Sequence, residues 1–204
     1  MRRARERPGG GLRERKKQRT REAIQSAAMR LFGEQGYDAT TIEQIAAAAD
    51  VSPSTFFNYF PTKEDVVFAD EFEPLIARLF LARPLHEPLG VAMRRALLDV
   101  MPGLDEGDRE LMLARGRLLM DTPALHGHLW RDLQRSQDIV RALMAERTGR
   151  DPEDFELRVI STVLVAAMTA AMTEWTRQDG RVDIMKLLDP AMDLFERGAR
   201  LDAP

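Results

Sequence analysis

The segment formed by residues 40–63, TTIEQIAAAADVSPSTFFNYFPTK, constrains the fold most strongly, because it encodes two short helices joined by a sharp turn. Thr40 and the glutamate three residues later have the spacing of a capping box, which predicts the start of the first helix. Asp50 is expected to take the left-handed conformation of the turn. Ser52 and Pro53 are residue types favoured at the N-cap and the first position of a second helix. This pattern predicts a helix-turn-helix.

The second helix of this motif has two faces. Phe56 and Phe60 lie one turn apart, so both are expected to anchor the helix in the core. Ser54, Phe57 and Asn58 are expected on the opposite face, where hydroxyl groups suit phosphates, and the amide and the ring suit base edges in a major groove. The helix is therefore predicted to read DNA, and the residues assigned to this contact are Thr41, Ser52, Pro53, Ser54, Thr55, Phe57, Asn58, Tyr59 and Lys63.

The charge of the chain is uneven, and its positive end leads into the helix-turn-helix. Residues 1–21 hold ten Arg and Lys against two Glu, a net charge of +8, whereas the remaining residues carry −11. A basic arm beside such a motif favours salt-sensitive DNA binding, and residues 1–12, with their Pro-Gly-Gly-Gly run, are expected to be disordered without DNA. The alternative, a helix-turn-helix that serves only for packing, has no need of a polar outer face beside a basic arm.

Five residue pairs and one single residue occur in this segment with a characteristic spacing: Thr41-Ile42, Ile45-Ala46, Val51-Ser52, Thr55, Tyr59-Phe60 and Lys63-Glu64. Together, within roughly residues 18–66, they resemble the DNA-binding signature of the TetR family of bacterial repressors. Two positions depart from the family pattern, since Asp50 stands where the family usually has Gly, and Phe57 where it more often has Tyr. The resemblance implies a dimeric repressor with a C-terminal ligand domain, coupled to the DNA-binding domain by the helix that begins at Lys63.

The rest of the chain shows helical periodicity interrupted by Pro, Gly or Asp-Gly, and no alternating pattern typical of strands. We therefore expect an all-α fold of about nine helices, with a three-helix DNA-binding domain over residues 13–62 and a ligand-binding and dimerisation domain over residues 63–204. One continuous helix is expected over residues 63–81. The first helix is expected at residues 13–35, and the later ones at residues 89–101, 107–120, 123–147, 153–178 and 183–199.

The last two of these helices carry more apolar surface than a single core needs. Doubled by a two-fold axis, they would form a four-helix bundle, the arrangement that the TetR resemblance also implies. A dimer also suits DNA recognition, because two short recognition helices read the two halves of a palindrome. We therefore expect a homodimer bound to a palindromic operator in double-stranded DNA.

The second domain is also rich in residues that could line an apolar ligand site. Most of the eleven Met residues fall in it, and their flexible side chains suit either adaptable core packing or a deformable pocket. Arg117, among Leu and Met residues, needs an anion, which is either Glu174 or Asp179 or an acidic group of a ligand. Gln137 is either a satisfied core amide or a ligand contact. The candidate ligand-binding residues are Met93, Leu97, Leu113, Arg117, Met120, Leu133, Gln137, Met168, Met172 and Trp175.

A looser motif in this domain comprises the run LMLARGRLLMDTPAL of Leu111–Leu125, then Leu129, Gln137, Ala142-Leu143 and Trp175. It resembles the ligand domain of TetR regulators that bind acyl-CoA-like ligands or are found beside mycofactocin gene clusters. The resemblance implies a long-chain acyl group or its CoA thioester as the effector, with its chain in an apolar tunnel and its polar head near Arg117 or surface arginines. The alternative is a constitutive, ligand-blind DNA-binding protein whose second domain only dimerises.

Composition argues against several other functions. The chain has no Cys, so it forms neither a disulfide nor a Cys-based zinc site, which suits a reducing cytoplasm. His126 and His128 would point in nearly opposite directions on a helix, and no catalytic constellation is present, so we expect neither an enzyme nor a cofactor. The apolar run Val159–Met172 has 14 residues, too few to cross a bilayer of ~30 Å, and no secretory signal is recognisable. We expect a cytoplasmic protein without a membrane partner.

Overall fold

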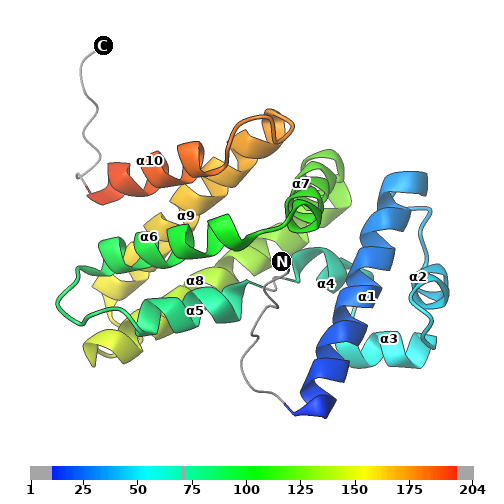
Figure 1. Ribbon diagram of the computed structural model, residues 1–204, viewed down its shortest axis with the longest axis horizontal. Coiled ribbons are helices and arrows are strands. Elements are labelled where there is room, and N and C mark those ends of the chain that lie inside the picture. The colour runs from blue at the N-terminus through cyan, green and yellow to red at the C-terminus, as the bar shows by residue number, and fades with distance from the viewer. Residues whose placement is uncertain (1–10, 70–71, 197–204) are drawn as a thin grey trace, which may run out of the picture. The chain divides into compact units, whose positions relative to one another are not determined.

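The computed structural model describes residues 11–69 and 72–196, within which all regular structure is helical (Figure 1). The chain forms two compact units, one ending at Ala69 and the other beginning at Asp70. The expected all-α fold with an N-terminal helix-turn-helix is confirmed. Residues 63–69 belong to the first unit, whereas the sequence had assigned them to the second. The basic arm expected at residues 1–12 lies mostly outside the described residues.

The first unit contains a long helix, the two short helices of the helix-turn-helix, and a fourth helix that packs on the first. The two short helices are joined by the sharp turn that the sequence predicts, and α2 packs on both the long helix and α3. In chain order the helices are α1 (Leu12–Gln35), α2 (Ile42–Ala48), α3 (Pro53–Tyr59) and α4 (Lys63–Phe68).

The capping box of α2 lies one residue later than the sequence suggested. The Thr41 hydroxyl accepts from the Gln44 amide at 3.2 Å, and the Gln44 side chain accepts from the Thr41 amide at 2.9 Å. Thr40 is buried instead, and its hydroxyl donates to the carbonyl of Gly36 at 2.7 Å. The expected pairing of Thr40 with Glu43 is therefore wrong, because the Thr40 hydroxyl is used to close the end of α1.

The expected continuous helix over residues 63–81 is also wrong. α4 ends at Phe68, Ala69 is extended, and α5 (Glu73–Leu81) begins after a break. Pro74 explains the break, because a proline inside a helix lacks the amide N–H and clashes with the carbonyl four residues earlier. At the start of α5 the same proline is tolerated, since the first amides of a helix have no intrahelical partner.

The described residues of the second unit, 72–196, form six α-helices. α9 packs against α8 and α10, α10 also packs against α6, and α5 packs on α6. Two short 3₁₀ turns, Met101–Gly103 and Pro123–Leu125, precede α7 and α8. After α5, the helices are α6 (Leu89–Val100), α7 (Glu106–Asp121), α8 (His126–Thr148), α9 (Phe155–Arg177) and α10 (Met185–Glu196).

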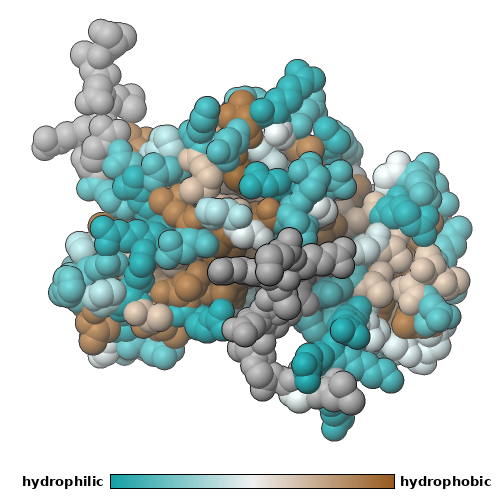
Figure 2. Space-filling view, in the orientation of Figure 1, coloured by the Kyte–Doolittle hydropathy of each residue, from teal (hydrophilic) through white to brown (hydrophobic). Residues whose placement is uncertain are grey.

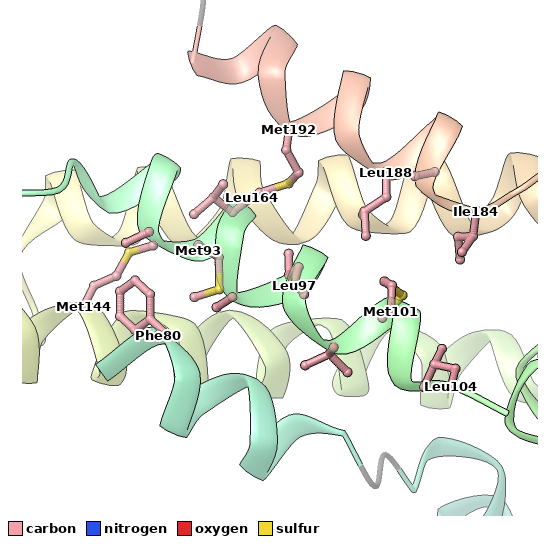
Figure 3. Packing of buried hydrophobic residues seen from close by; sticks show 14 of the residues in the cluster. Phe80, Met93, Leu97, Met101, Leu104, Met144, Leu164, Ile184, Leu188 and Met192 are labelled. Carbon is pink, nitrogen blue, oxygen red and sulfur yellow. The ribbon is translucent and has the colours of Figure 1, made fainter. Parts of the chain in front are cut away.

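The core of this unit is a single apolar cluster between these helices (Figure 3). Phe80 of α5 lies beside Met144 of α8, while Met93 of α6 lies near the centre of the cluster. α10 contributes Leu188 and Met192, both buried. The apolar side of α10 is therefore used within its own chain, a point that bears on dimerisation below.

α7 approaches α9 closely at a glycine. A Cβ atom added to Gly116 would lie 2.2 Å from the Oγ1 atom of Thr176, a buried residue of α9 whose hydroxyl donates to the Met172 carbonyl. Real Cβ atoms essentially never come that close to another atom. The contact between α7 and α9 at this point therefore depends on a residue without a side chain.

Gly116→Ala is expected to destabilise the second unit by about 1–3 kcal/mol, the usual range for overpacking. The measurement is thermal unfolding followed by circular dichroism. Gly127→Ala is the matched control, because Gly127 is also helical but nothing lies near its added Cβ, so alanine there is expected to be neutral or stabilising. Equal effects of the two substitutions would contradict the close approach of α7 to α9.

Candidate nucleic-acid interface and effector site

The turn between α2 and α3 has the geometry that its sequence predicts. Asp50 has a φ angle of 54°, in the left-handed region, and the Val51 amide donates to the Ala46 carbonyl at 2.9 Å. Ser52 is the N-cap of α3, since its hydroxyl accepts from the Thr55 amide at 3.1 Å, and Pro53 follows at the first helical position. These local features set the direction in which α3 leaves the turn.

α3 is anchored by two phenylalanines. Phe56 is 0% exposed and Phe60 is 1% exposed, with their ring centroids 5.9 Å apart. Other side chains of the unit are also fully buried, including Ile24 of α1 and Ile45 of α2. The expected inward face is confirmed, and it holds α3 rigidly against the rest of the unit.

The outer face of α3 is exposed and mostly polar. Phe57 is 52% exposed, and Ser54 and Asn58 are also exposed beside it. The Ser52 hydroxyl lies 2.8 Å from that of Ser54 and 2.9 Å from that of Thr55, so three hydroxyl groups gather at the start of the helix. Such a surface offers donors to phosphates at one end and an amide and an aromatic ring to bases along its length.

The remaining predicted DNA contacts fall into two groups. Thr41 and Pro53 are exposed, and Tyr59 is half-buried on the flank of α3. Lys63 is partly occupied, because its ammonium donates to the carbonyls of Tyr37 at 2.8 Å and Thr40 at 3.0 Å. An ammonium group has three N–H donors, so one is left for a phosphate.

Tyr37 is a residue of this unit that the sequence analysis missed. Its hydroxyl donates to a carboxylate oxygen of Glu64 at 2.6 Å, and the Lys63 ammonium lies 4.0 Å from its ring centroid. Burial, followed by the Glu64 carboxylate, raises the pKa of Tyr37 well above its ordinary value, so the hydroxyl stays a donor. The local sequence signal for this role was an aromatic residue directly after Gly36, which ends α1.

The basic side chains of α1 are exposed over its first half, with one exception. Arg13, Arg15, Lys17 and Arg19 are all solvent-exposed. Arg21 is half-buried, and its guanidinium lies 4.5 Å from the ring centroid of Phe60. The exposed cations remain available to phosphates, whereas Arg21 helps to hold the end of α3.

The predicted ligand-binding residues do not form one group. Met93, Leu97 and Trp175 belong to the buried core cluster of the second unit, and Leu113, Met168 and Met172 pack against that cluster. The other four lie outside this set: Arg117, Met120, Leu133 and Gln137. The structure therefore brings six of the ten candidates together around the core.

The two polar candidates both have partners within the chain. The Arg117 guanidinium pairs with the Asp179 carboxylate at 3.1 Å, one of the two structural partners that the sequence offered. Gln137 accepts a hydrogen bond from the Thr162 hydroxyl at 3.3 Å, which links α8 to α9. Both side chains of the Arg117–Asp179 pair are about half exposed, so the pair is accessible to an anionic competitor.

α9 also has an apolar side that remains exposed in the part of the chain that the structure describes. Phe155 is 74% exposed, and Val159 and Val163 follow it at steps of four residues, one helical turn apart. Leu157 and Leu164, on the other side of the helix, are buried. The face of the molecule seen in Figure 2 is, by contrast, mostly hydrophilic, with hydrophobic residues showing between hydrophilic ones. We call Phe155, Val159 and Val163 the α9 stripe.

By length and composition α9 would be able to cross a membrane, with a mean hydropathy of 1.6 over its most apolar window. The apolar run of 14 residues, Val159–Met172, is only part of this helix. A single helix of this kind is weak evidence, because core helices of soluble proteins have the same property. The division of α9 into a buried side and an exposed stripe fits a helix between protein surfaces better than one surrounded by lipid.

Comparisons with known proteins agree with this geometry. Residues 24–69, which span the helix-turn-helix, match the family described as bacterial regulatory proteins, tetR family. Residues 87–200 match the family described as the MftR C-terminal domain. The first match covers the candidate nucleic-acid interface, and the second covers all of the candidate ligand-binding residues.

Individual relatives are similar along most of the chain. The chain is 36% identical over 179 residues to the HTH-type transcriptional regulator TcmR of Streptomyces glaucescens, covering 82% of this chain and 77% of TcmR. It is 25% identical over 190 residues to the mycofactocin biosynthesis transcriptional regulator MftR of Mycobacterium tuberculosis, covering 92% and 94% of the two chains.

A solved structure extends the likeness to three dimensions. The Thermus thermophilus repressor FadR, in complex with lauroyl-CoA, superposes with a TM-score of 0.55 at 27% identity, covering 90% of this chain and 97% of FadR. The matching families and relatives are transcriptional regulators and not enzymes. α3 is rigidly seated and faces outward, both units match families of such regulators, and the chain is related to TcmR along most of its length. The chain therefore belongs to the TetR family of DNA-binding transcriptional regulators.

Proposed function

We propose that the protein is a homodimeric, effector-responsive repressor that binds a palindromic operator through α3. The observation that carries this proposal is the division of α3 into two faces. Phe56 and Phe60 fix the helix in the unit, while Ser54, Phe57 and Asn58 are exposed on its outer side. In this proposal Asn58 and Phe57 contact bases.

Phosphate contacts in this proposal come from several parts of the first unit. Thr41 and Tyr59 supply hydroxyl groups, Lys63 supplies its remaining N–H donor, and the exposed cations of α1 extend the positive surface. The net charge of +8 over residues 1–21 supports this role, because the rest of the chain is acidic and would repel DNA. Such contacts position the protein on the duplex without selecting a sequence.

Dimerisation is assigned to α9 together with the neighbouring α8. The α9 stripe is apolar and exposed, and the hydrogen bond between Gln137 and Thr162 places α8 next to it. The pairing of α9 with α10 that the sequence suggested is less suitable, because Leu188 and Met192 of α10 are buried in the core. A bundle of two helices from each protomer would cover the stripe.

The proposed effector is a hydrophobic molecule such as a long-chain acyl-CoA, in a cytoplasmic setting. The likeness to FadR, which was solved with lauroyl-CoA, and the match to the MftR C-terminal domain support this class. The acyl chain would displace or separate side chains around the methionine-rich core, and Arg117 would exchange Asp179 for the polar head. A coupling free energy of about 1–3 kcal/mol would be enough for useful control.

A ligand-blind regulator is the second candidate function. Met93, Leu97 and Trp175 are almost completely buried in a core that packs without a ligand, which favours a domain that only dimerises. The two candidates differ in one observable. An effector-responsive repressor loses operator affinity when the effector is added, whereas a ligand-blind regulator does not.

The test is operator binding by the purified protein, using DNA from its own promoter region at two salt concentrations, with and without lauroyl-CoA. Tight, salt-sensitive binding that lauroyl-CoA weakens is expected. Unchanged binding would retain the regulator and discard this effector class. Absence of any sequence-selective binding would refute operator recognition.

Asn58→Ala is expected to weaken operator binding by about 1–3 kcal/mol, the usual value of a side-chain contact to a base. Binding to unrelated DNA should change little, because that binding depends on phosphates. His86→Ala, at an exposed position between α5 and α6, is the control and should leave both affinities unchanged. Equal weakening on operator and unrelated DNA would assign Asn58 to the backbone instead of the bases.

A further inference from the structure

The C-terminal end of α4 is held to α1 by one buried amide. Gln25, in the middle of α1, is 2% exposed, and its Nε2 group donates to the carbonyls of Val66 at 3.2 Å and Ala69 at 2.8 Å. The last carbonyls of a helix have no partners further along the helix, so these hydrogen bonds complete its end. Both N–H groups of the Gln25 amide are thereby used at the end of α4.

The N-terminal end of α4 is held to the loop that precedes α2. Lys63 donates to two carbonyls of that loop, and Glu64 accepts from the Tyr37 hydroxyl at 2.6 Å. Between the two ends, Val66 and Val67 are fully buried. A helix of six residues has almost no stability of its own, so these contacts determine where α4 lies.

We infer that Gln25 is a positioning residue for effector control, because it fixes α4 to α1 and makes α4 and the helix-turn-helix move as one rigid unit. This inference rests on the proposed function. The second unit begins directly after Ala69, whose carbonyl Gln25 binds. A movement of the second unit is therefore transmitted to the whole DNA-reading unit and is not absorbed by displacement of α4.

Hydrogen exchange of the full-length protein, followed by mass spectrometry, tests the rigid unit without DNA or effector. Gln25→Met preserves the approximate size of the side chain but removes both donors. Exchange over residues 63–69 is expected to accelerate by at least about tenfold, which corresponds to about 1.4 kcal/mol, with α2 and α3 unchanged. Gln25→Glu should accelerate it further, because a carboxylate faces the two carbonyls.

Gln18→Met is the matched control for exchange. Gln18 lies on the same helix, and its amide donates to Glu22, one turn along α1, at 3.2 Å. Its replacement is expected to leave exchange in α4 unchanged. Unaltered exchange in α4 of the Gln25→Met variant, or equal acceleration in α2, α3 and α4, would overturn the inference, since the second result means only general destabilisation.

Operator binding with lauroyl-CoA as the probe tests the regulatory part. Gln25→Met is expected to keep effector-free operator affinity within about threefold, and to lose most of the weakening that lauroyl-CoA causes in the wild type. A full lauroyl-CoA response in this variant would refute the role in control. If the wild type binds no operator or ignores lauroyl-CoA, the proposed function or its effector class fails, and hydrogen exchange alone decides whether Gln25 fixes α4.

Discussion

Val163→Arg is expected to convert the proposed dimer to a monomer and to weaken binding to the proposed operator by about a hundredfold or more. Val163 lies on the α9 stripe, which is exposed in the single chain. Across a two-fold axis the substitution would introduce two arginines into an apolar interface, where charges without partners are costly. A monomer binds only one half of a palindrome and loses the avidity of the second half, which is commonly worth about 10²–10⁴ in affinity.

The measurements are sedimentation velocity for the oligomeric state and binding to a full palindrome and to an isolated half-site. The full-palindrome affinity should fall and the half-site affinity should stay the same, because α3 belongs to the first unit and Val163 to the second. Leu85→Arg is the matched control, since Leu85 is a highly exposed aliphatic residue outside the stripe. A Val163→Arg protein that remains dimeric would exclude the stripe as the interface.

Local sequence signals predicted the first unit well. The turn at Asp50 and the start of α3 at Ser52 and Pro53 were correct because each depends on neighbours within a few residues. The errors arose where two local signals competed. Thr40 and Thr41 are both able to cap a helix, and only the folded chain shows that the Thr40 hydroxyl closes α1. Pro74 was overlooked because the apolar periodicity continues on both sides of it.

The polar residues that organise the molecule were not predictable in the same way. Gln25 binds carbonyls 41 and 44 residues away, and Tyr37 binds a carboxylate 27 residues away. Periodicity identifies apolar faces, but it does not reveal which polar side chain in such a face will find a partner. The assignment of Arg117 stayed open for the same reason, because Asp179 lies 62 residues further along the chain.

Arg147→Met is expected to destabilise the second unit by about 2–4 kcal/mol, the largest effect we expect on folding from one substitution. Arg147, near the end of α8, donates to the carbonyl of Phe80, near the end of α5, and to three carbonyls of the connection from α5 to α6, those of Arg83, Pro84 and Glu87. Its guanidinium also lies 5.2 Å from the Phe80 ring centroid. Methionine retains apolar packing but removes the guanidinium. The carbonyls of Phe80 and Pro84 keep their backbone donors, whereas those of Arg83 and Glu87 lose a partly buried donor.

Arg150→Met is the control. It tests whether the loss of any arginine with close partners destabilises the unit, or only the loss of a partly buried one. Arg150 makes two close ion pairs, at 2.6 Å to Asp154 and 2.7 Å to Glu156, but its side chain is exposed to solvent. Exposed pairs contribute little to stability because water and salt screen them, so its replacement should leave thermal unfolding unchanged. If Arg147→Met lowers the free energy of unfolding no more than Arg150→Met does, water must replace the guanidinium at the four carbonyls without a loss of stability. A loss confined to Arg147→Met would show that one side chain of α8 fixes the α5–α6 connection.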